Sequence, residues 1–139
     1  KFDAPSVAVD LLIFNQDCSK ILLINRADHP FVNKLALPGG FYIPSDQTIE
    51  EAASRELKEE TSVSLKITNK NLVKITSTKN RDPRGWVISI AYKVVVNEND
   101  VKPIANSDAL YANWVDVNSI KEDNMAFDHF EILNYSLNN

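Results

Sequence analysis

A run of acidic residues inside one predicted helix constrains this chain most strongly. Residues Arg55–Thr61 read Arg-Glu-Leu-Lys-Glu-Glu-Thr. At about 100° of rotation per residue, Glu56 and Glu60 fall on the same stripe as Ile49, the side on which a surface helix buries apolar groups. Two carboxylates one helical turn apart repel each other, and burial raises their pKa values unless a cation compensates. The pattern therefore predicts a divalent metal site, with a solvated acidic face as the alternative.

The residues before this helix define its start and offer a place where backbone can approach a ligand. We expect the helix to cover Thr48–Thr61, because Thr48 and Glu51 have the pattern of a capping box. In such a box the side chain of each residue accepts a hydrogen bond from the backbone amide of the other. The pair Gly39 and Gly40 precedes it, in a chain with only three glycines. Adjacent glycines allow positive φ and let backbone carbonyls approach an ion closely, although a tight hairpin is the alternative use.

The segment Gly40–Val63 resembles the signature of the Nudix hydrolase family, Gly-x5-Glu-x7-Arg-Glu-U-x-Glu-Glu-x-Gly-U, in which U is aliphatic. The second half of the pattern is matched by Arg55, Glu56, Leu57, Glu59, Glu60 and Val63. Ser62 stands where the family has a glycine that closes the helix in the left-handed conformation. The loop in the first half is one residue longer, so the family's first glutamate falls on Asp46 counted from the glycine and on Gln47 counted back from the arginine.

The resemblance implies hydrolysis of a nucleoside diphosphate linked to another moiety, with Mg²⁺ or Mn²⁺ held by carboxylates and a backbone carbonyl. Carried over by position, Glu56 and Glu60 would coordinate the ion together with the carbonyl of Gly39 or Gly40. Oxygen ligands and retained waters suit Mg²⁺. The ion would neutralise the pyrophosphate and lower the pKa of a bound water for in-line attack on phosphorus.

Members of the family differ in where the general base lies. By resemblance Glu59 is a third ligand or a candidate base, and Arg55 would orient a glutamate through a charge-assisted hydrogen bond. Glu98 and Asp100 are candidates for a base on a later loop, and a solvated turn is the alternative for that segment.

A turn with two arginines indicates which subgroup of the Nudix family the chain resembles. Arg81 and Arg84 could clamp a pyrophosphate bidentately, and an ordinary exposed turn is the alternative. The run Asn80–Tyr92 looks like the corresponding segment of ADP-ribose pyrophosphatase-like Nudix proteins and of Nudix-related regulators of NAD metabolism.

Two further places bear on this resemblance. Ala126–His129 and the helix that follows are similar to the closing element of the same relatives. His129 either packs locally at the helix start or touches ligand. Arg26 matches a basic position common in the family, implying contact with substrate, and a surface arginine is an equally good interpretation.

The order of elements predicts an α/β fold. Strands are expected at Ser6–Phe14, Lys20–Asn25, Lys34–Leu37, Leu72–Ser77, Trp86–Val96 and Tyr111–Asp116, and helices at Thr48–Thr61 and Asp128–Leu137. Strands interrupted by only two helices fit a mixed central β-sheet between helices, which is the Nudix α/β/α sandwich that the resemblance implies. Residues 1–139 are expected to form a single Nudix domain.

Composition agrees with one globular domain. The chain has 139 residues, 44% of them hydrophobic, which is enough for a real core. Its one cysteine excludes an intrachain disulfide, and without a long apolar run we expect a cytoplasmic protein that does not contact the membrane. The net charge of -4 argues against nucleic-acid binding by this domain.

Three functions fit these features. The first is hydrolysis of ADP-ribose to AMP and ribose 5-phosphate. The second is a domain that binds ADP-ribose without turnover and controls a DNA-binding domain absent from this chain. The third is a pyrophosphatase that removes oxidised nucleoside triphosphates. The complete set Arg55, Glu56, Glu59 and Glu60 favours the enzyme, because a sensor has no need for all the metal ligands. A homodimer and a monomer both remain open.

Overall fold

The structure is a computed structural model that describes residues 3–106 and 109–139. Its strands are β1 (Ser6–Phe14), β2 (Lys20–Arg26), β3 (Leu35–Ala36), β4 (Gly39–Phe41), β5 (Leu72–Thr76), β6 (Val87–Val95) and β7 (Ala109–Asp116). Its helices are α1 (Ile49–Thr61) and α2 (His129–Leu137), joined to the strands in part by short 3-10 turns.

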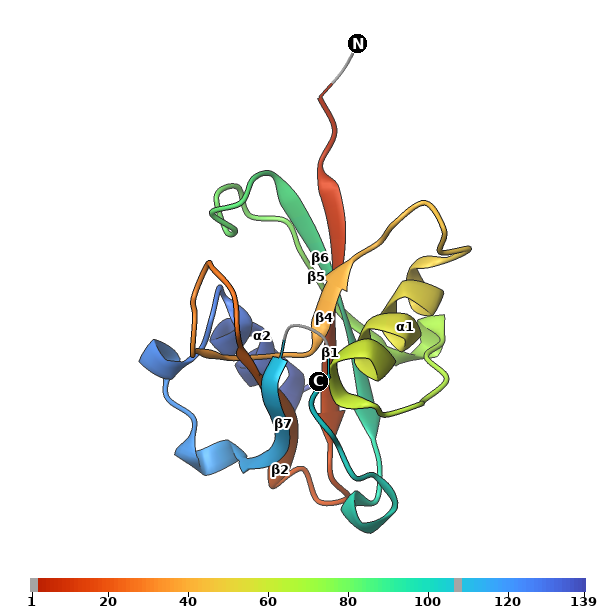
Figure 1. Ribbon diagram of the computed structural model, residues 1–139, viewed down its shortest axis with the longest axis vertical. Coiled ribbons are helices and arrows are strands. Elements are labelled where there is room, and N and C mark those ends of the chain that lie inside the picture. Colours follow the sequence, from red (N-terminus) through yellow and green to blue (C-terminus); the bar gives the residue numbers. More distant parts are fainter. Residues whose placement is uncertain (1–2, 107–108) are drawn as a thin grey trace.

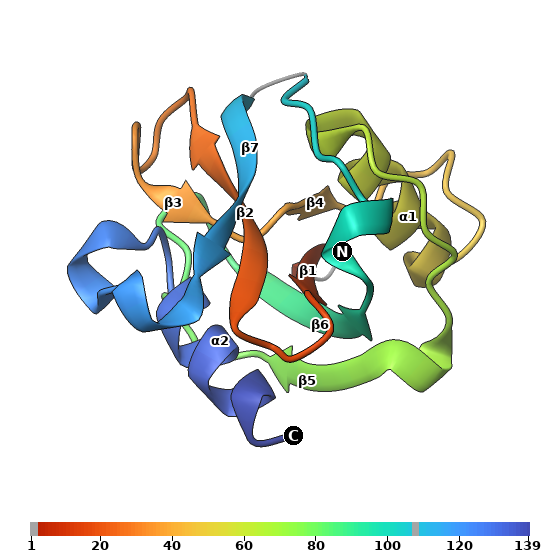
Figure 2. The same ribbon diagram turned by 90° about the horizontal axis from the view of Figure 1, so that it is seen from below.

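The strands form one mixed sheet of seven strands. Its order is β3-β2-β1-β6-β5, with β4 paired to β1 and β7 paired to β2. Strands β1 and β6 are parallel, and the other pairs are antiparallel. Figure 1 and Figure 2 show α1 and α2 on opposite sides of this sheet. The predicted α/β/α sandwich with a mixed central sheet is confirmed.

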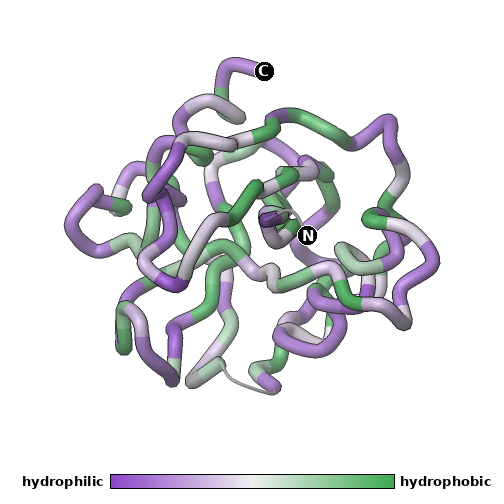
Figure 3. Tube along the Cα trace, turned by 90° about the horizontal axis from the view of Figure 1, so that it is seen from above, coloured by the Kyte–Doolittle hydropathy of each residue, from purple (hydrophilic) through white to green (hydrophobic). Residues whose placement is uncertain are grey.

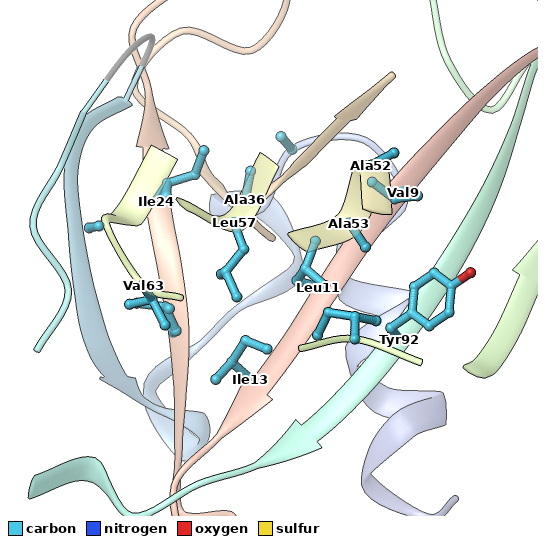
Figure 4. Packing of buried hydrophobic residues seen from close by; sticks show 14 residues of the cluster. Val9, Leu11, Ile13, Ile24, Ala36, Ala52, Ala53, Leu57, Val63 and Tyr92 are labelled. Atoms are coloured by element: carbon cyan, nitrogen blue, oxygen red, sulfur yellow. The ribbon is translucent and has the colours of Figure 1, made fainter. Parts of the chain in front are cut away.

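Strand β1 runs through the middle of the molecule and is buried from Ala8 to Phe14. Because successive side chains of a strand point to opposite faces, β1 serves both layers. Val9, Leu11 and Ile13 pack into one cluster with residues of α1, as the close view in Figure 4 shows. The alternate residues Leu12 and Phe14 pack into a second cluster with residues of α2. Two cores, one on each face, hold the sheet between the helices.

Both ends of α1 lie where the sequence predicts them. The Thr48 hydroxyl accepts a hydrogen bond from the Glu51 amide at 3.0 Å. The reciprocal bond from the Glu51 side chain is absent from the described structure, so only half of the predicted capping box forms. At the other end Ser62 adopts the left-handed conformation, with φ of 63°, and its amide donates to Lys58 O at 2.9 Å. The serine therefore closes the helix as the expected glycine would.

The glycine pair, for which a tight hairpin was the alternative prediction, forms part of strand β4. Gly39 lies opposite Asp10 and Gly40 opposite Val9 in an antiparallel pair with β1, so neither glycine makes a hairpin turn. Neither is among the residues with positive φ. Their use is close approach: a Cβ on Gly39 would lie 2.0 Å from Val9 O, and one on Gly40 would lie 2.1 Å from a carboxylate oxygen of Glu56.

Other boundaries differ by one or two residues. Strand β3 is shorter than the predicted segment 34–37, and β7 starts two residues before the predicted Tyr111. Figure 3 shows that much of the hydrophilic sequence lies on peripheral loops and turns. Neither helix in the described part of the chain is long and apolar enough to cross a membrane.

Candidate metal and substrate site

A pocket of about 420 Å³ opens between α1, β4 and the end of β2. Most of the residues predicted for the site line it together, namely Arg26, Gly39, Gly40, Arg55, Glu56, Glu60 and Arg84. Two are placed differently: Glu59 lies on α1 with its side chain 47% exposed, and Arg81 lines a smaller adjoining cavity. Glu56 and Glu60 come from α1, together with Arg55, whereas Arg26 and Arg84 reach the pocket from other elements.

Glu60 is the most deeply placed carboxylate of α1 in this pocket. Its Oε1 accepts a hydrogen bond from the Gly39 amide at 2.7 Å. Burial raises the pKa of Glu60 to about 8, and the nearby Glu56 shifts it in the same direction, while the Gly39 amide and Arg26 oppose the shift. The pKa of Glu56 is also raised by burial, against the effect of its arginine neighbour Arg55. Both raised pKa values mean that the ionised carboxylates are disfavoured in the pocket, and a bound cation would stabilise them.

The donor set fits a divalent ion that prefers oxygen. The missing Cβ of Gly40 leaves its backbone in close contact with the Glu56 carboxylate. Among residues 3–106 and 109–139, no three His, Cys, Asp or Glu side chains are placed to hold an ion by themselves. An ion here would therefore take Glu56 and Glu60 together with a backbone carbonyl and waters, a set that suits Mg²⁺ or Mn²⁺.

Arg55 organises the acidic side of the pocket. Its guanidinium donates to both oxygens of Asp46, at 2.8 and 2.9 Å, and to Phe41 O at 3.0 Å. It also donates to Glu56 and, at 3.0 Å, to Glu59. The hydrogen bonds that Arg55 donates to Asp46 hold the pKa of Asp46 below its usual range, and the same bonds raise the pKa of Arg55. A single arginine thus orients the carboxylates on either side of it.

The two arginines of the predicted turn have different environments. Arg81 donates to both oxygens of Asp128 at 2.6 and 2.7 Å, and its side chain is only 5% exposed. Arg84 is 38% exposed and pairs with Asp82 at 2.7 Å. Only Arg84 lines the main pocket, so this turn presents one guanidinium there rather than two.

Besides Arg55 and Arg84, the pocket is lined by the guanidinium of Arg26. Arg26 and Arg84 both stack on the ring of Phe127, with their central carbons 5.0 and 4.8 Å from its centroid. Arg84 also lies 4.8 Å from the ring centroid of Phe41. Burial and the nearby charge of Arg84 both lower the pKa of Arg26. Two cations held close together on aromatic faces favour a bound anion.

Comparison with known proteins shows the family to which the chain belongs. A family model of the NUDIX domain matches residues 4–135. The chain belongs to the Nudix family. It is 43% identical over 129 residues to an ADP-ribose pyrophosphatase of Methanocaldococcus jannaschii, covering 93% of this chain and 71% of the relative.

A repressor and a solved NUDIX domain are also similar to this chain. An ADPR responsive transcriptional repressor, NtrR, of Acinetobacter baylyi is 33% identical over 138 residues, covering 95% of this chain and 53% of the repressor. The NUDIX domain of Shewanella oneidensis NrtR, crystallised with ADP ribose, superposes with a TM-score of 0.86 at 26% identity, covering 99% of this chain and 89% of that one. The chain thus spans about half the length of the repressor that it matches. The predicted resemblance to both subgroups is confirmed.

The structure distinguishes the two candidates for the first acidic position of the Nudix signature by their contacts. Asp46 is buried and accepts hydrogen bonds from Arg55, whereas Gln47 is exposed. These contacts favour the count forward from the glycine.

The candidates for a base on a later loop lie elsewhere. Glu98 accepts hydrogen bonds from Asn15 at 3.0 Å and from Lys20 at 3.2 Å, at the turn between β1 and β2. Asp100 belongs to the same short 3-10 turn. Neither residue lines the pocket, so the structure does not bring this segment to the Nudix site.

One residue near the Nudix site, Asp10, escaped the sequence interpretation. Asp10 is 6% exposed, and its Oδ1 lies 3.2 Å from Nε2 of His129, while its other oxygen accepts from Ser89. Burial alone would raise the pKa of Asp10, but His129, Ser89 and Arg81 together hold it below its usual range. The available signal was an acid in an otherwise apolar strand, since period-two alternation places Asp10 on the face of β1 that meets α2.

Proposed function

We propose that this protein is a metal-dependent Nudix pyrophosphohydrolase that cleaves ADP-ribose to AMP and ribose 5-phosphate. The observation that carries the proposal is the pairing of two walls in one pocket. The half-buried carboxylates of Glu56 and Glu60 on α1 form one wall, and the guanidiniums of Arg26 and Arg84, which come from other elements, form the other. A pyrophosphate with its metal ion carries charges that fit both walls. The 43% identity to an ADP-ribose pyrophosphatase supports the choice of substrate.

The residues of α1 would hold the ion. Glu56 and Glu60 would bind Mg²⁺ or Mn²⁺ with the carbonyl of Gly40, and Arg55 keeps the Glu56 carboxylate turned toward the pocket. When bound, the ion supplies charge neutralisation at the pyrophosphate and an acidified water. Glu59, held by Arg55 at 3.0 Å and partly exposed, is our candidate for the base or for a further ligand.

The opposite wall would bind the diphosphate. Arg84 presents a guanidinium that aromatic rings hold in place on two sides, and Arg26 approaches the same ring of Phe127 from nearby. Held guanidiniums lose little entropy when they grip a phosphate. We assign Arg81 to the support of this wall, because its ion pair with Asp128 ties the arginine turn to the start of α2.

The main alternative is a sensor that binds ADP-ribose without turnover. Its support is the similarity to the ADPR responsive repressor and to the NrtR domain crystallised with ADP ribose. What favours the enzyme is that Arg55, Glu56, Glu59 and Glu60 are all present and that the arginine contacts Asp46, Glu56 and Glu59. Removal of oxidised nucleoside triphosphates is the third candidate.

A substrate panel separates these functions. Purified protein is incubated with ADP-ribose, NADH, sugar nucleotides, dinucleoside polyphosphates and oxidised nucleoside triphosphates, with Mg²⁺ or Mn²⁺ and with chelator as control. Turnover of ADP-ribose that stops with chelator supports the hydrolase. Tight binding of ADP-ribose without turnover supports the sensor, and preference for an oxidised triphosphate supports the third function.

The domain organisation, the location and the partners are proposals as well. We propose one Nudix domain over residues 1–139, a cytoplasmic location, and no binding of nucleic acid by this domain. The oligomeric state is to be measured by light scattering, which distinguishes a homodimer from a monomer.

A further inference from the structure

The segment Leu37–Gly40 contains the Gly40 carbonyl that is the proposed backbone ligand of the metal ion. Strand β1 holds the middle of this segment, because the Leu11 amide donates to Pro38 O at 2.8 Å. The first amide of the segment is held by a side chain from the far end of the sequence: the Leu37 amide donates to Nδ1 of His129 at 3.0 Å. The position of the metal-facing backbone therefore depends on the first residue of α2.

The His129 ring is itself fixed in one orientation. Its Nδ1 accepts a hydrogen bond, so Nε2 carries the hydrogen that faces Asp10 Oδ1 at 3.2 Å. The second oxygen of Asp10 accepts from the Ser89 hydroxyl. Asp10 also lies directly behind the glycine strand, since a Cβ on Gly39 would be 3.0 Å from its Oδ1. All of these groups are buried, and none of them contacts the pocket carboxylates through an ion pair.

We propose that His129, oriented by Asp10, is a positioning residue for the metal site. Its imidazole holds the Leu37 amide and thereby sets the distance between the Gly40 carbonyl and the carboxylates of α1. Hydrogen-bonded groups behind a metal's ligands change metal affinity or activity by about 10- to 100-fold when they are removed. The inference rests on the proposed metal-dependent function. A histidine that only stabilised the fold would leave metal affinity unchanged.

Two substitutions separate the roles of the two ring nitrogens. His129→Asn places an amide oxygen near the position of Nδ1, where it can accept from the Leu37 amide. His129→Gln reaches toward Nε2 and Asp10 but leaves the Leu37 amide without its acceptor. The dissociation constant for Mn²⁺ is measured on the purified chain, without substrate, from the electron paramagnetic resonance signal of free Mn²⁺.

We expect His129→Gln to weaken Mn²⁺ binding by about tenfold and His129→Asn to restore most of that loss. Amide exchange at Leu37, followed by NMR, should be faster in His129→Gln than in His129→Asn. The matched control is Ile132→Val, a buried position of the same helix. It should lower the melting temperature without changing the Mn²⁺ affinity. Equal Mn²⁺ affinity in wild type and His129→Gln would overturn the proposal. The proposal would also fail if the loss of Mn²⁺ affinity followed the drop in melting temperature in every variant, including Ile132→Val.

If His129→Gln does not fold, Mn²⁺ binding is measured on Asp10→Ala instead. This substitution leaves the imidazole in place without its orienting partner, and we expect weaker Mn²⁺ binding in the same direction. Unchanged affinity in Asp10→Ala would also overturn the proposal. A wild type that binds Mn²⁺ but does not cleave ADP-ribose would refute the proposed function and leave this inference standing. A wild type that does not bind Mn²⁺ would refute both.

Discussion

The two walls of the pocket are built in different ways. The acidic wall comes from one helix, in which Arg55, Glu56 and Glu60 lie within six consecutive positions. The basic wall comes from three distant parts of the chain, represented by Arg26, Arg84 and Phe127. A helix places its side chains by a regular period, whereas the basic wall exists only after β2, the arginine turn and the start of α2 have packed together. Helical spacing can therefore be read from the sequence, and the contacts of the second wall cannot.

The largest expected effect concerns the acidic wall. Glu60→Gln keeps an oxygen that can accept from the Gly39 amide but removes the negative charge that would bind the ion. Because loss of groups behind a ligand already costs about 10- to 100-fold, loss of this ligand should lower metal-dependent turnover by more than about 100-fold. The measurement is kcat/KM for ADP-ribose against Mg²⁺ concentration. Wild-type activity in Glu60→Gln would show that this carboxylate is not a ligand.

The two glycines of β4, next to the acidic wall, offer a sharper comparison. The nearest atoms to a Cβ at Gly40 belong to the side-chain carboxylate of Glu56, whereas a Cβ at Gly39 would lie 2.0 Å from the backbone oxygen of Val9. We expect Gly40→Ala to fold and to lose most of its metal affinity, and Gly39→Ala to lose several kcal/mol of stability, about the range of severe core substitutions. Circular dichroism melting and Mn²⁺ titration give the two readings. A Gly40→Ala protein with normal Mn²⁺ affinity would count against the carbonyl ligand.

The basic wall predicts different KM effects for its two neighbouring arginines. Arg84→Ala should raise KM for ADP-ribose by about tenfold, because this guanidinium is partly exposed and faces the pocket. It should also lower the melting temperature, because buried Asp82 keeps the Arg84 amide as a donor but loses the guanidinium. Arg81→Ala should lower stability by about 3 kcal/mol, because it leaves Asp128 without its buried partner. Steady-state kinetics and urea unfolding on both variants test this. Equal effects on KM would mean that both arginines bind substrate, as a two-arginine clamp requires.

The smallest expected effect is a pH dependence of stability in the ion-free protein. The pKa of Glu60 is raised to about 8 in the folded state from an ordinary value of 4.5. Between these values the folded state binds a proton that the unfolded state has lost, so stability is highest below the lower value and falls as pH rises toward the upper one. We expect the melting temperature with chelator to fall by several degrees over this range.

Mg²⁺ should recover more of this loss at pH 8 than at pH 5.5, because it replaces the proton on the carboxylate. Glu60→Gln is the control and should flatten the slope. A slope unchanged in Glu60→Gln would assign the pH dependence to another group.

The fold and the acidic wall were largely predictable because their signals are local. Alternating or continuous apolar runs mark the strands, and Thr48 and Ser62 mark the ends of α1. The residue at the first acidic position was not predictable, because one extra loop residue left Asp46 and Gln47 equivalent by counting. Only the tertiary contact with Arg55 distinguishes them.

What the sequence missed depends on contacts between distant residues. Asp10 and His129 are separated by most of the chain, yet they meet under the glycine strand. Arg81 appeared equivalent to Arg84 because both lie on one turn, and the difference between them is the partner that α2 supplies at Asp128. Side-chain pairs of this kind follow from how the layers pack, which no local period encodes.

The most direct test of the two-wall account is the position of the ion in crystals grown with Mn²⁺ and an ADP-ribose analogue whose bridging oxygen is replaced by a methylene group, which the enzyme cannot cleave. The ion is located by anomalous scattering. The account predicts one Mn²⁺ at about 2 Å from oxygens of Glu56 and Glu60 and from the Gly40 carbonyl, with the pyrophosphate between it and Arg84. An ion bound away from α1, or a pyrophosphate that contacts neither Arg26 nor Arg84, would contradict it.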